Sequence, residues 1–277
     1  MRMLSFYQIF LLFILYSFLG WFCEVLYCSI YQRKFVNRGF LYGPICPIYG
    51  VGAIVIFSLL SSLADNLVIL FISSMVLTSI IEYFTSWVME KLFDTKWWDY
   101  SNYKFNINGR VCLLNSTLFG IMGIVAVRFV HPFVLSILYS INDIWTKTLS
   151  ITFMVIFVID LIFTLKSLVN FKQYLRRFED FIHTIFTKIE QEKWVINIHD
   201  NLEELVEKIK EKLIHHTEEN KNQLILQKDM KKEDLEKKLR EFIEKRKSYN
   251  RYIVKFPDIK SKKYRKSLEH IKSLLKK

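Results

Sequence analysis

The stretch Asn37-Arg-Gly-Phe-Leu-Tyr-Gly-Pro-Ile-Cys-Pro-Ile-Tyr-Gly50 lies between two long apolar runs, and the rest of the chain is organised around it. Its fourteen residues include three glycines, two prolines and three aromatic residues. Proline fixes φ and lacks an N–H donor, while glycine permits left-handed or closely packed backbone. Because irregular backbone at membrane depth must pack against protein or line a cavity, the stretch predicts an ordered, non-helical loop at the mouth of a membrane bundle. A well-packed helix–loop–helix turn without a binding site is the simpler alternative.

Composition and charge divide the chain into two parts. Of the 277 residues, 52% are hydrophobic and 16% are aromatic, which is high for a soluble protein. Residues 1–165 carry a net charge of +2, whereas residues 166–277 carry +10. We therefore expect an all-α fold in two domains. Residues 1–168 would form a polytopic helical membrane bundle, and residues 169–277 would form a basic, helical and coiled-coil cytoplasmic tail.

Five stretches are apolar enough, and long enough at about 1.5 Å per residue, to cross about 30 Å of hydrocarbon. The expected spans are residues 3–31, 43–63, 67–89, 111–127 and 148–166. The first lacks a small-residue cleavage site, so it predicts a retained span and not a signal peptide. The apolar segment His131–Ile141 is too short to cross, and its His131-Pro132 pair predicts a break. Whether this segment crosses the membrane or lies on it stays open.

The distribution of Lys and Arg between the loops predicts the orientation. The loops at 32–42 and 90–110 and the tail are basic, while Ala64-Asp65-Asn66 carries no base. Basic loops stay on the cytoplasmic side of a membrane. We therefore expect a multi-pass plasma-membrane protein with its N-terminus outside and its C-terminal tail in the cytoplasm.

The tail contains three recognisable segments. Phe171–Phe186 mixes bases with aromatics and predicts a helix that lies along the inner leaflet and binds anionic lipid headgroups. Residues Leu202–Leu213 repeat four aliphatic side chains at 4-3-4 spacing, which is typical of a coiled coil. Lys245–Lys277 holds thirteen bases. Such a run is also typical of nucleic-acid binding, but on a membrane protein we favour a solvated or headgroup-binding tail and expect no nucleic-acid partner.

Three carboxyl groups fall within the expected spans, at Glu24, Glu82 and Asp160. An ionisable group in a span costs a few kcal/mol on insertion scales, so it faces the bundle interior. With the orientation above, all three lie in the inner half of the bilayer, near the loops that hold Arg38 and Arg110. Ion pairs of Glu24 or Glu82 with either arginine would lower the cost of burial. Two interpretations stay open: the pairs lock the loops onto the bundle, or the carboxyl groups form a path for substrate or protons.

The two basic loops supply candidates for gating or for docking a partner. An aromatic belt at the interface would account for the tryptophans and tyrosines of the second loop, but not for the Asn, Asp and Arg residues between them. The candidates are Asn37, Arg38, Gly39, Gly43, Pro44, Pro47, Tyr49, Trp97, Trp98, Asp99, Tyr100, Asn106, Gly109 and Arg110. No catalytic set is visible. The four cysteines form no Cys-x-x-Cys pair, so we expect no metal site.

Five ordered motifs in the first half of the chain together resemble a known family. They are Gly-Trp-Phe-x-Glu at 20–24, the stretch at 37–50, Ile-Glu-Tyr-Phe-Thr-Ser-Trp at 81–87, Trp-Trp-Asp-Tyr-Ser at 97–101 and Asn-x-x-Gly-Arg-Val-Cys-Leu at 106–113. Over roughly residues 5–140 the chain resembles the bacterial integral membrane proteins named ABC-transporter permeases of the CmpB type. The resemblance implies a multi-pass plasma-membrane protein with a permease role, and the tail lies outside it.

The permease interpretation requires a second subunit. ATP-driven transport needs a Gly-rich phosphate-binding loop, and none of the eight glycines begins one. We therefore expect no cofactor in this chain and ATP only through a separate ATPase partner. The Glu-Ala-Ala…Gly coupling pattern of importer permeases is absent from the sequence, which weakens the ATP-coupled interpretation.

We interpret the chain as a transport component with a carboxylate-lined cavity near the cytoplasmic face. A membrane-embedded enzyme for a lipid-linked substrate is one alternative, and an adaptor that recruits a partner through its tail is another. Stripes of polar residues on several spans favour a cavity over a simple anchor. The substrate, the direction of movement and the oligomeric state, including a homo-oligomer, stay open.

Overall fold

The computed structural model describes residues 4–191 and 251–275 and the single residues Lys237, Glu241, Glu244, Lys245 and Tyr249. The chain divides into two units. The first comprises Met1–Val169 together with Lys255–Lys260, and the second comprises Asn170–Val254 together with Ser261–Lys277. The predicted coiled coil at residues 202–213 lies outside the described residues.

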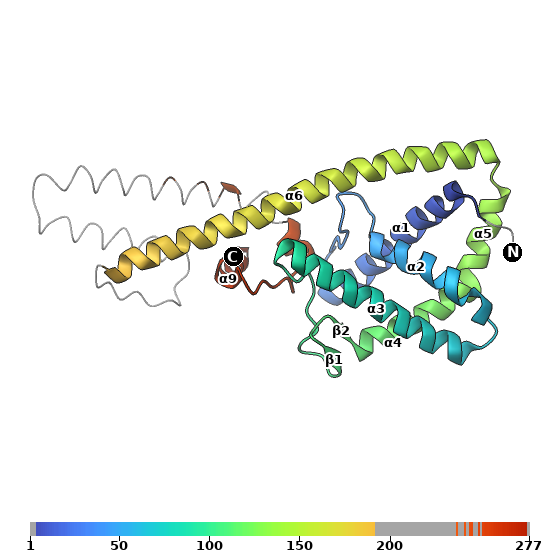
Figure 1. Cartoon of the computed structure of the whole chain (residues 1–277), viewed down its shortest axis with the longest axis horizontal. Coiled ribbons are helices and arrows are strands. Elements are labelled where there is room, and N and C mark those ends of the chain that lie inside the picture. The colour runs from blue at the N-terminus through green and yellow to red at the C-terminus, as the bar shows by residue number, and fades with distance from the viewer. Residues whose placement is uncertain are drawn as a thin grey trace, which may run out of the picture. The chain divides into compact units, whose positions relative to one another are not determined.

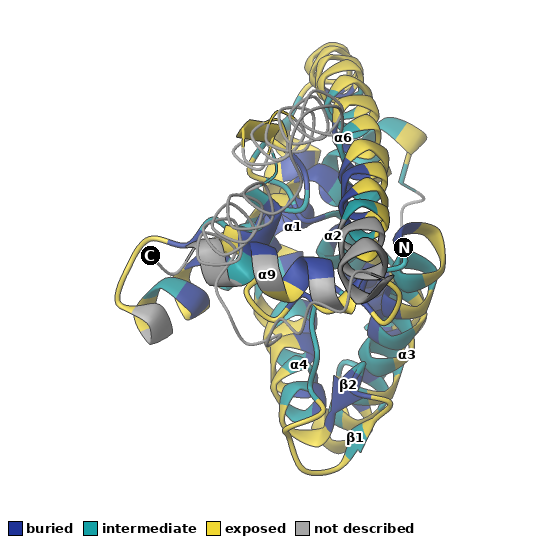
Figure 2. Cartoon of the chain, turned by 90° about the vertical axis from the view of Figure 1, so that its left-hand side faces the viewer, coloured by how far each residue is buried: buried dark blue, intermediate teal, exposed yellow. Residues whose placement is uncertain are grey.

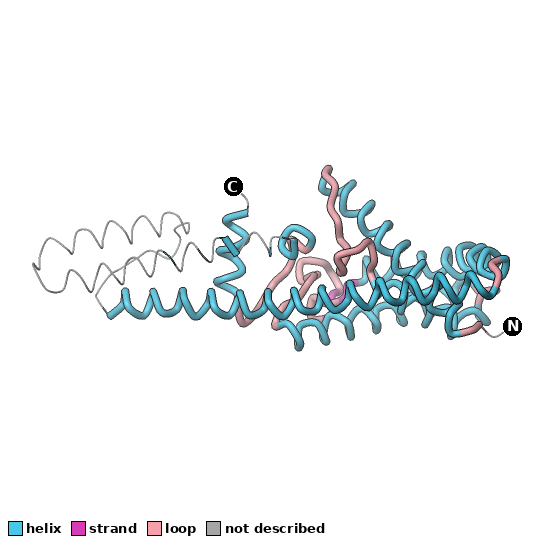
Figure 3. Tube along the Cα trace, turned by 90° about the horizontal axis from the view of Figure 1, so that it is seen from above, coloured by secondary structure: helices cyan, strands magenta, loops and turns pink. Residues whose placement is uncertain are grey.

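The first unit is a set of helices joined by short loops, with one small β-hairpin (Figure 1). Its helices are α1 (Phe6–Gln32), α2 (Pro47–Leu60), η1 (Ser61–Leu63), α3 (Leu67–Phe93), α4 (Leu113–Val125), η2 (Ala126–Val130), α5 (His131–Ser140) and the first part of α6 (Asp143–Gln191). The strands β1 (Asn106–Ile107) and β2 (Val111–Cys112) pair antiparallel, with Asn106 opposite Cys112. The longest loops of this unit follow α1 and α3 (Figure 3).

The helix boundaries follow from local sequence. Ser5 caps α1 in a capping box, since its hydroxyl accepts from the Gln8 N–H and the Gln8 side chain accepts from the Ser5 N–H. The Asn66 side chain caps α3 by accepting from the Ile69 N–H at 3.1 Å. Both long helices end on a residue in the left-handed region, Arg33 after α1 and Asp94 after α3, and the chain turns sharply at each.

In the part of the chain that the structure describes, four helical segments are long and apolar enough to cross a membrane. They are Phe6–Ile30, Leu67–Phe93, Leu113–Ser140 and Asp143–Phe181, and the shorter apolar helix Pro47–Leu63 corresponds to the predicted span at 43–63. The helix that begins at Leu113 continues beyond the expected end at Val127 and runs through Pro132 to Ser140. Proline is accommodated there because it lies in the first turn of α5, directly after the π-helical turn η2.

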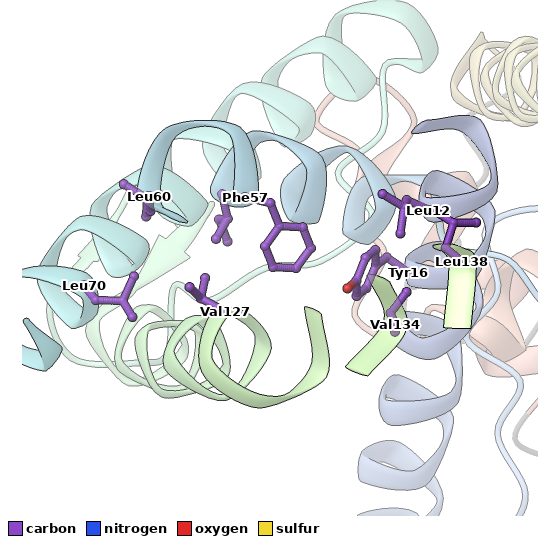
Figure 4. Close-up of a cluster of buried hydrophobic side chains, with 9 residues drawn as sticks. Leu12, Tyr16, Phe57, Leu60, Leu70, Val127, Val134 and Leu138 are labelled. Carbon is purple, nitrogen blue, oxygen red and sulfur yellow. The ribbon is translucent and has the colours of Figure 1, made fainter. Parts of the chain in front are cut away.

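The core of the first unit lies where α1, α2, α3, η2 and α5 meet (Figure 4). It is built from Leu12, Tyr16, Ile56, Phe57, Leu60, Leu70, Val127, Val134 and Leu138. One polar pair is buried within it: the Tyr16 hydroxyl lies 3.1 Å from Nδ1 of His131, and the His131 ring stacks on Phe57 at 3.7 Å. The Tyr16 hydroxyl and the His131 ring thus satisfy one another, as a buried environment favours.

Small residues allow the helices to approach closely. A Cβ atom built on Gly20 of α1 would lie 2.2 Å from Cγ of Tyr49 on α2, and one on Gly123 of α4 would lie 2.4 Å from Ser74 on α3. Close approach at glycine is typical of helix pairs in membranes. Figure 2 colours much of α6 as exposed, and its exposed residues between Ile144 and Val169 are largely apolar, as expected for a surface that faces lipid.

The second unit contains the end of α6 and helix α9 (Arg265–Leu275). Its described core is aromatic and aliphatic, with Phe171, Leu175, Phe178, Tyr252 and Ile271 all buried. The ring centroids of Phe171 and Tyr252 lie 5.2 Å apart. This packing explains the aromatic residues that the sequence places among the bases of the tail.

Candidate functional site: two carboxylates closed by two loops

The loop after α1 is fixed to the helices at both of its ends. The Asn37 side-chain oxygen accepts from the Trp21 indole N–H at 3.0 Å and from the Gly39 N–H at 2.9 Å. Farther along the loop, the Cys46 N–H donates to the Ser17 carbonyl at 3.0 Å. Asn37 therefore provides the turn, and α1 supplies the anchoring groups at both ends. The loop is ordered and non-helical, as the sequence predicts.

Asp160 of α6 holds the middle of the same loop. Its Oδ1 accepts from the Tyr42 N–H at 2.9 Å, and its Oδ2 accepts from the Gly43 N–H at 2.8 Å. Thr164, one turn along α6, donates to Oδ1 at 3.1 Å. A Cβ atom on Gly43 would lie 3.0 Å from Oδ2, so glycine allows this approach. The Asp160 carboxyl group thus accepts hydrogen bonds from two backbone N–H groups of the loop.

The loop after α3 is folded by its own polar residues. The Tyr100 N–H donates to the Gly109 carbonyl at 2.8 Å, and the Trp98 indole N–H donates to the Arg110 carbonyl at 2.9 Å. The Asn106 side chain accepts from the Gly109 N–H at 3.0 Å. Gly109 has φ +66°, and a Cβ atom there would lie 2.3 Å from the Asp99 carboxylate. This loop geometry aims the Tyr100 side chain at α3.

Glu24 of α1 is bound from two elements. The Tyr49 hydroxyl of α2 donates to Oε2 at 2.7 Å, and the Arg38 Nε lies 3.4 Å from Oε1. Arg38 is only 15% exposed at its side chain. Burial is the largest single effect and opposes the charged form, but the nearby negative groups, Glu24 first among them, together hold the pKa of Arg38 above its ordinary value. The predicted pairing of Glu24 with Arg38 is present.

Glu82 of α3 has a different environment. It is 7% exposed, and its Oε1 accepts from the Tyr100 hydroxyl at 3.1 Å. Its Oε2 is buried and has no hydrogen-bond partner among the described residues. Burial, followed by the negative charges of Glu82 and Glu24, raises the pKa of Tyr100 well above its ordinary value, so its hydroxyl keeps its proton. Tyr100 therefore lies within electrostatic reach of both carboxylates.

Arg110 pairs with a residue that sequence reasoning did not single out. Its Nη2 lies 2.6 Å from Oε2 of Glu90, and its guanidinium lies over the Tyr83 ring at 5.4 Å. Among the described residues, Glu82 has no arginine or lysine in an ion pair. The predicted alternative pairings of Glu82 with Arg38 or Arg110 are thus not formed. Glu90 lies two turns after Glu82 on the same helix, and this spacing is visible in the sequence.

The structure brings some of the predicted residues together and separates others. Glu24, Arg38, Tyr49, Glu82 and Tyr100 form one cluster, which we call the carboxylate site. Asn115 of α4, which the sequence did not single out, partly offsets the rise in the pKa of Tyr100. Gly39 is buried in the first loop, Pro44 is exposed, and Pro47 begins α2. Trp97 and Asp99 face a segment from the far end of the chain, which is described below.

An apolar groove of about 660 Å³ lies elsewhere, between α3, the hairpin and α4. Its lining includes Ile80, Phe84, Ile107 and Leu113, and neither Glu24 nor Glu82 lines it. Among the described residues, His, Cys, Asp and Glu side chains form no group of three or more that could hold a metal ion. In the carboxylate site, by contrast, Glu24 and Glu82 can offer negative charge to a ligand, and Tyr49 and Tyr100 can offer hydroxyl donors.

These features define a multi-pass α-helical membrane protein, with four candidate spans among the described residues and an ordered pair of loops over the carboxylates of Glu24 and Glu82. The family model described as "Putative ABC-transporter type IV", of the CmpB type, matches residues 11–165, which is more than half of the chain. The chain belongs to this family. The match confirms the resemblance inferred from the motifs and extends it to residue 165. No curated protein and no solved structure matches the chain.

Proposed function

We propose that the chain is the membrane-embedded permease subunit of an ABC transporter and that the carboxylate site binds a proton or a cation. The observation that carries this proposal is the Oε2 atom of Glu82, which is buried without a hydrogen-bond partner among the described residues. A buried carboxylate oxygen without a partner is costly, and the cost falls when a proton or cation binds. Glu24 lies within electrostatic reach of the same Tyr100 hydroxyl.

We propose different roles for the two carboxylates. Glu24 is already neutralised by Arg38 and receives the Tyr49 hydroxyl, so it is suited to shape the site and to hold the first loop. Glu82 has one hydroxyl donor and no paired cation among the described residues, so it is suited to bind. An intramembrane carboxyl group with this environment is typical of ion and proton paths.

We further propose five crossings with the N-terminus outside. They are the four candidate spans and the short helix Pro47–Leu63, which is second in chain order. Basic loops then face the cytoplasm, and the loops at 32–42 and 90–110 lie on the side where an ATPase subunit docks. Exposed aromatic side chains on these loops support docking, because Phe35 is 76% exposed and Phe105 is 79% exposed. Exposed aromatic residues are typical of contacts in protein interfaces.

The test is purification of the tagged full chain from its native membrane in mild detergent, with identification of what accompanies it. We expect a stoichiometric subunit with ATPase activity. Phe35→Ala and Phe105→Ala should each reduce its recovery, whereas Phe129→Ala should not. Phe129 is a matched control because it is 68% exposed but lies in η2, away from both loops.

Two results would contradict the proposal. Recovery of the chain without an ATPase, in detergents that preserve known transporter complexes, would argue against ATP-driven transport. Recovery of an ATPase that all three phenylalanine variants retain equally would argue against docking through these loops. A lipid recovered with the solitary chain would favour the alternative of an enzyme for a lipid-linked substrate.

A further inference from the structure

The segment Lys255–Lys260 lies far along the sequence but belongs to the first unit. Its last residue pairs with the loop after α3 as a short antiparallel bridge. The Lys96 N–H donates to the Lys260 carbonyl at 2.7 Å, and the Lys260 N–H donates to the Lys96 carbonyl at 2.9 Å. Pairing of this kind is how a protein binds an extended peptide at an exposed backbone edge.

Side chains at both ends of the segment add charge-assisted contacts. The Lys260 ammonium lies 2.6 Å from Oδ2 of Asp99, which is 6% exposed at its side chain. Burial opposes ionisation of Asp99, but hydrogen bonds from Lys260 and Ser101 lower its pKa below the ordinary value. At the other end, the Lys255 ammonium donates to the Gly39 carbonyl at 2.9 Å and to the Leu41 carbonyl at 3.3 Å. Both ends of the bound segment, Lys255 and Lys260, are therefore basic.

An aromatic contact fills the middle. The Phe256 ring lies 5.1 Å from the Trp97 ring, edge to face, and the Arg38 guanidinium lies over Phe256 at 5.6 Å. Arg38 also donates to the Lys255 carbonyl at 3.0 Å. Trp97 is only 2% exposed. The arginine that neutralises Glu24 in the carboxylate site thus also binds this segment.

The sequence of the segment suits this surface. Pro257 and Asp258 form a turn in which the Ile259 N–H donates to the Phe256 carbonyl at 3.0 Å. Proline fixes φ for the second position of such a turn. The turn separates Phe256, which reaches Trp97, from Lys260, which reaches Asp99. A basic residue, an aromatic residue, a turn and a second basic residue are the features that the surface recognises.

We propose that Arg38, Gly39, Leu41, Lys96, Trp97 and Asp99 form a docking surface for an extended basic–aromatic peptide, and that Lys255–Lys260 of the same chain is its reversible resting occupant. The contact is small, six residues, and the Lys260 side chain is 59% exposed, so we infer that a competing peptide can displace the segment. The surface overlaps the loops to which we assign ATPase docking. Only that consequence rests on the proposed function; the docking surface itself rests on the contacts above.

Occupancy can be measured by disulfide trapping in the purified full chain. Paired residues of an antiparallel bridge have Cα atoms about 5.5 Å apart, which suits a disulfide. We expect Lys96→Cys with Lys260→Cys to form a linked peptide under mild oxidation, detected by mass spectrometry. Each single substitution, which leaves only the native cysteines as partners, is the control. Absence of the 96–260 link would overturn the proposal.

Reversibility is tested by competition with a synthetic peptide of residues 251–264. An excess of this peptide should slow formation of the 96–260 link severalfold, and a scrambled peptide of the same composition should not. Phe256→Ala should slow trapping as well, whereas Val254→Ala at a 58% exposed neighbouring position should not. Trapping that neither the peptide nor Phe256→Ala changes would show a permanent part of the fold and would overturn the proposal.

Recovery of the ATPase subunit distinguishes a failure of this inference from a failure of the proposed function. Where the subunit co-purifies, the oxidised 96–260 form should recover less of it than the reduced form. Equal recovery would show that the segment does not compete with the subunit. Failure to recover any ATPase contradicts the proposed function and leaves the peptide competition as the test of the docking surface.

Discussion

The guanidinium of Arg38 lies 3.4 Å from Glu24 at Nε and donates to the Lys255 carbonyl at 3.0 Å from Nη1. One side chain in the loop after α1 therefore contacts both an intramembrane carboxylate and the docked C-terminal segment. This arrangement links the state of the docking surface to the charge balance in the carboxylate site. Displacement of the segment would remove one of the contacts that fix Arg38 beside Glu24.

The first prediction concerns that ion pair. Glu24→Gln should destabilise the protein by about 1–3 kcal/mol, because the largely buried guanidinium of Arg38 loses its counter-charge. The measurement is thermal unfolding of the detergent-purified chain, together with its abundance in membranes. Adding Arg38→Met to Glu24→Gln should restore part of the loss, since no unpaired charge then stays buried. A single variant as stable as the wild type would show that the pair contributes nothing.

The second prediction separates binding from structure at Glu82. Glu82→Gln keeps an oxygen that can accept from Tyr100, and no described cation loses a partner, so we expect membrane abundance and stability close to those of the wild type. If Glu82 binds a proton or cation, ligand-dependent stabilisation should disappear. We would measure the melting temperature against pH and, separately, against sodium and potassium concentration.

Tyr100→Phe provides the contrast for Glu82. This variant removes the hydroxyl that donates to the Glu82 carboxylate, so it should destabilise the fold by about 1–3 kcal/mol while Glu82→Gln does not. Two variants with the same loss of stability would indicate a purely structural hydrogen bond. A Glu82→Gln protein that retains the full pH and cation dependence would contradict the proposed binding site.

The third prediction tests the anchoring role of Asp160. Asp160→Asn turns one of the two oxygens that accept from the Tyr42 and Gly43 N–H groups into a donor, and one backbone donor then loses its acceptor. We expect a loss of about 1–3 kcal/mol and faster proteolysis between residues 33 and 46. Thr164→Val, which removes only the hydroxyl donor to Asp160, should have a smaller effect. Equal proteolysis of both variants would contradict an anchoring role.

Much of this architecture is predictable from sequence because its signals are local. Apolar runs identify the helices, Asn66 marks the start of α3, and the glycines and prolines of 37–50 mark an ordered loop. The pairing of Glu24 with Arg38 is also predictable, since a buried carboxylate needs a nearby cation. The continuation of α4 through Pro132 is not, because a π-helical turn and the first-turn position of proline depend on backbone geometry.

The other parts of the site depend on contacts between distant segments. No local sequence signal indicates that Asp160 binds backbone N–H groups and does not join the carboxylate site. The partner of Arg110 is Glu90 because the hairpin turns Arg110 toward the end of α3. The docking of Lys255–Lys260 is the contact that the sequence predicts least, because in the sequence its lysines look like any others of the basic tail. Only the register with Lys96 distinguishes them.

The last prediction concerns the glycine that allows Tyr49 to reach Glu24. A Cβ atom on Gly20 would lie 2.2 Å from Cγ of Tyr49, so Gly20→Ala must displace that ring and its hydrogen bond to Glu24. We expect a loss of about 1–3 kcal/mol. Gly52→Ala is the matched control, because nothing lies within 4 Å of a Cβ there and alanine favours a helix by about 1 kcal/mol. Thermal unfolding should therefore separate the two variants in opposite directions, and a Gly20→Ala protein as stable as Gly52→Ala would contradict this packing of α1 on α2.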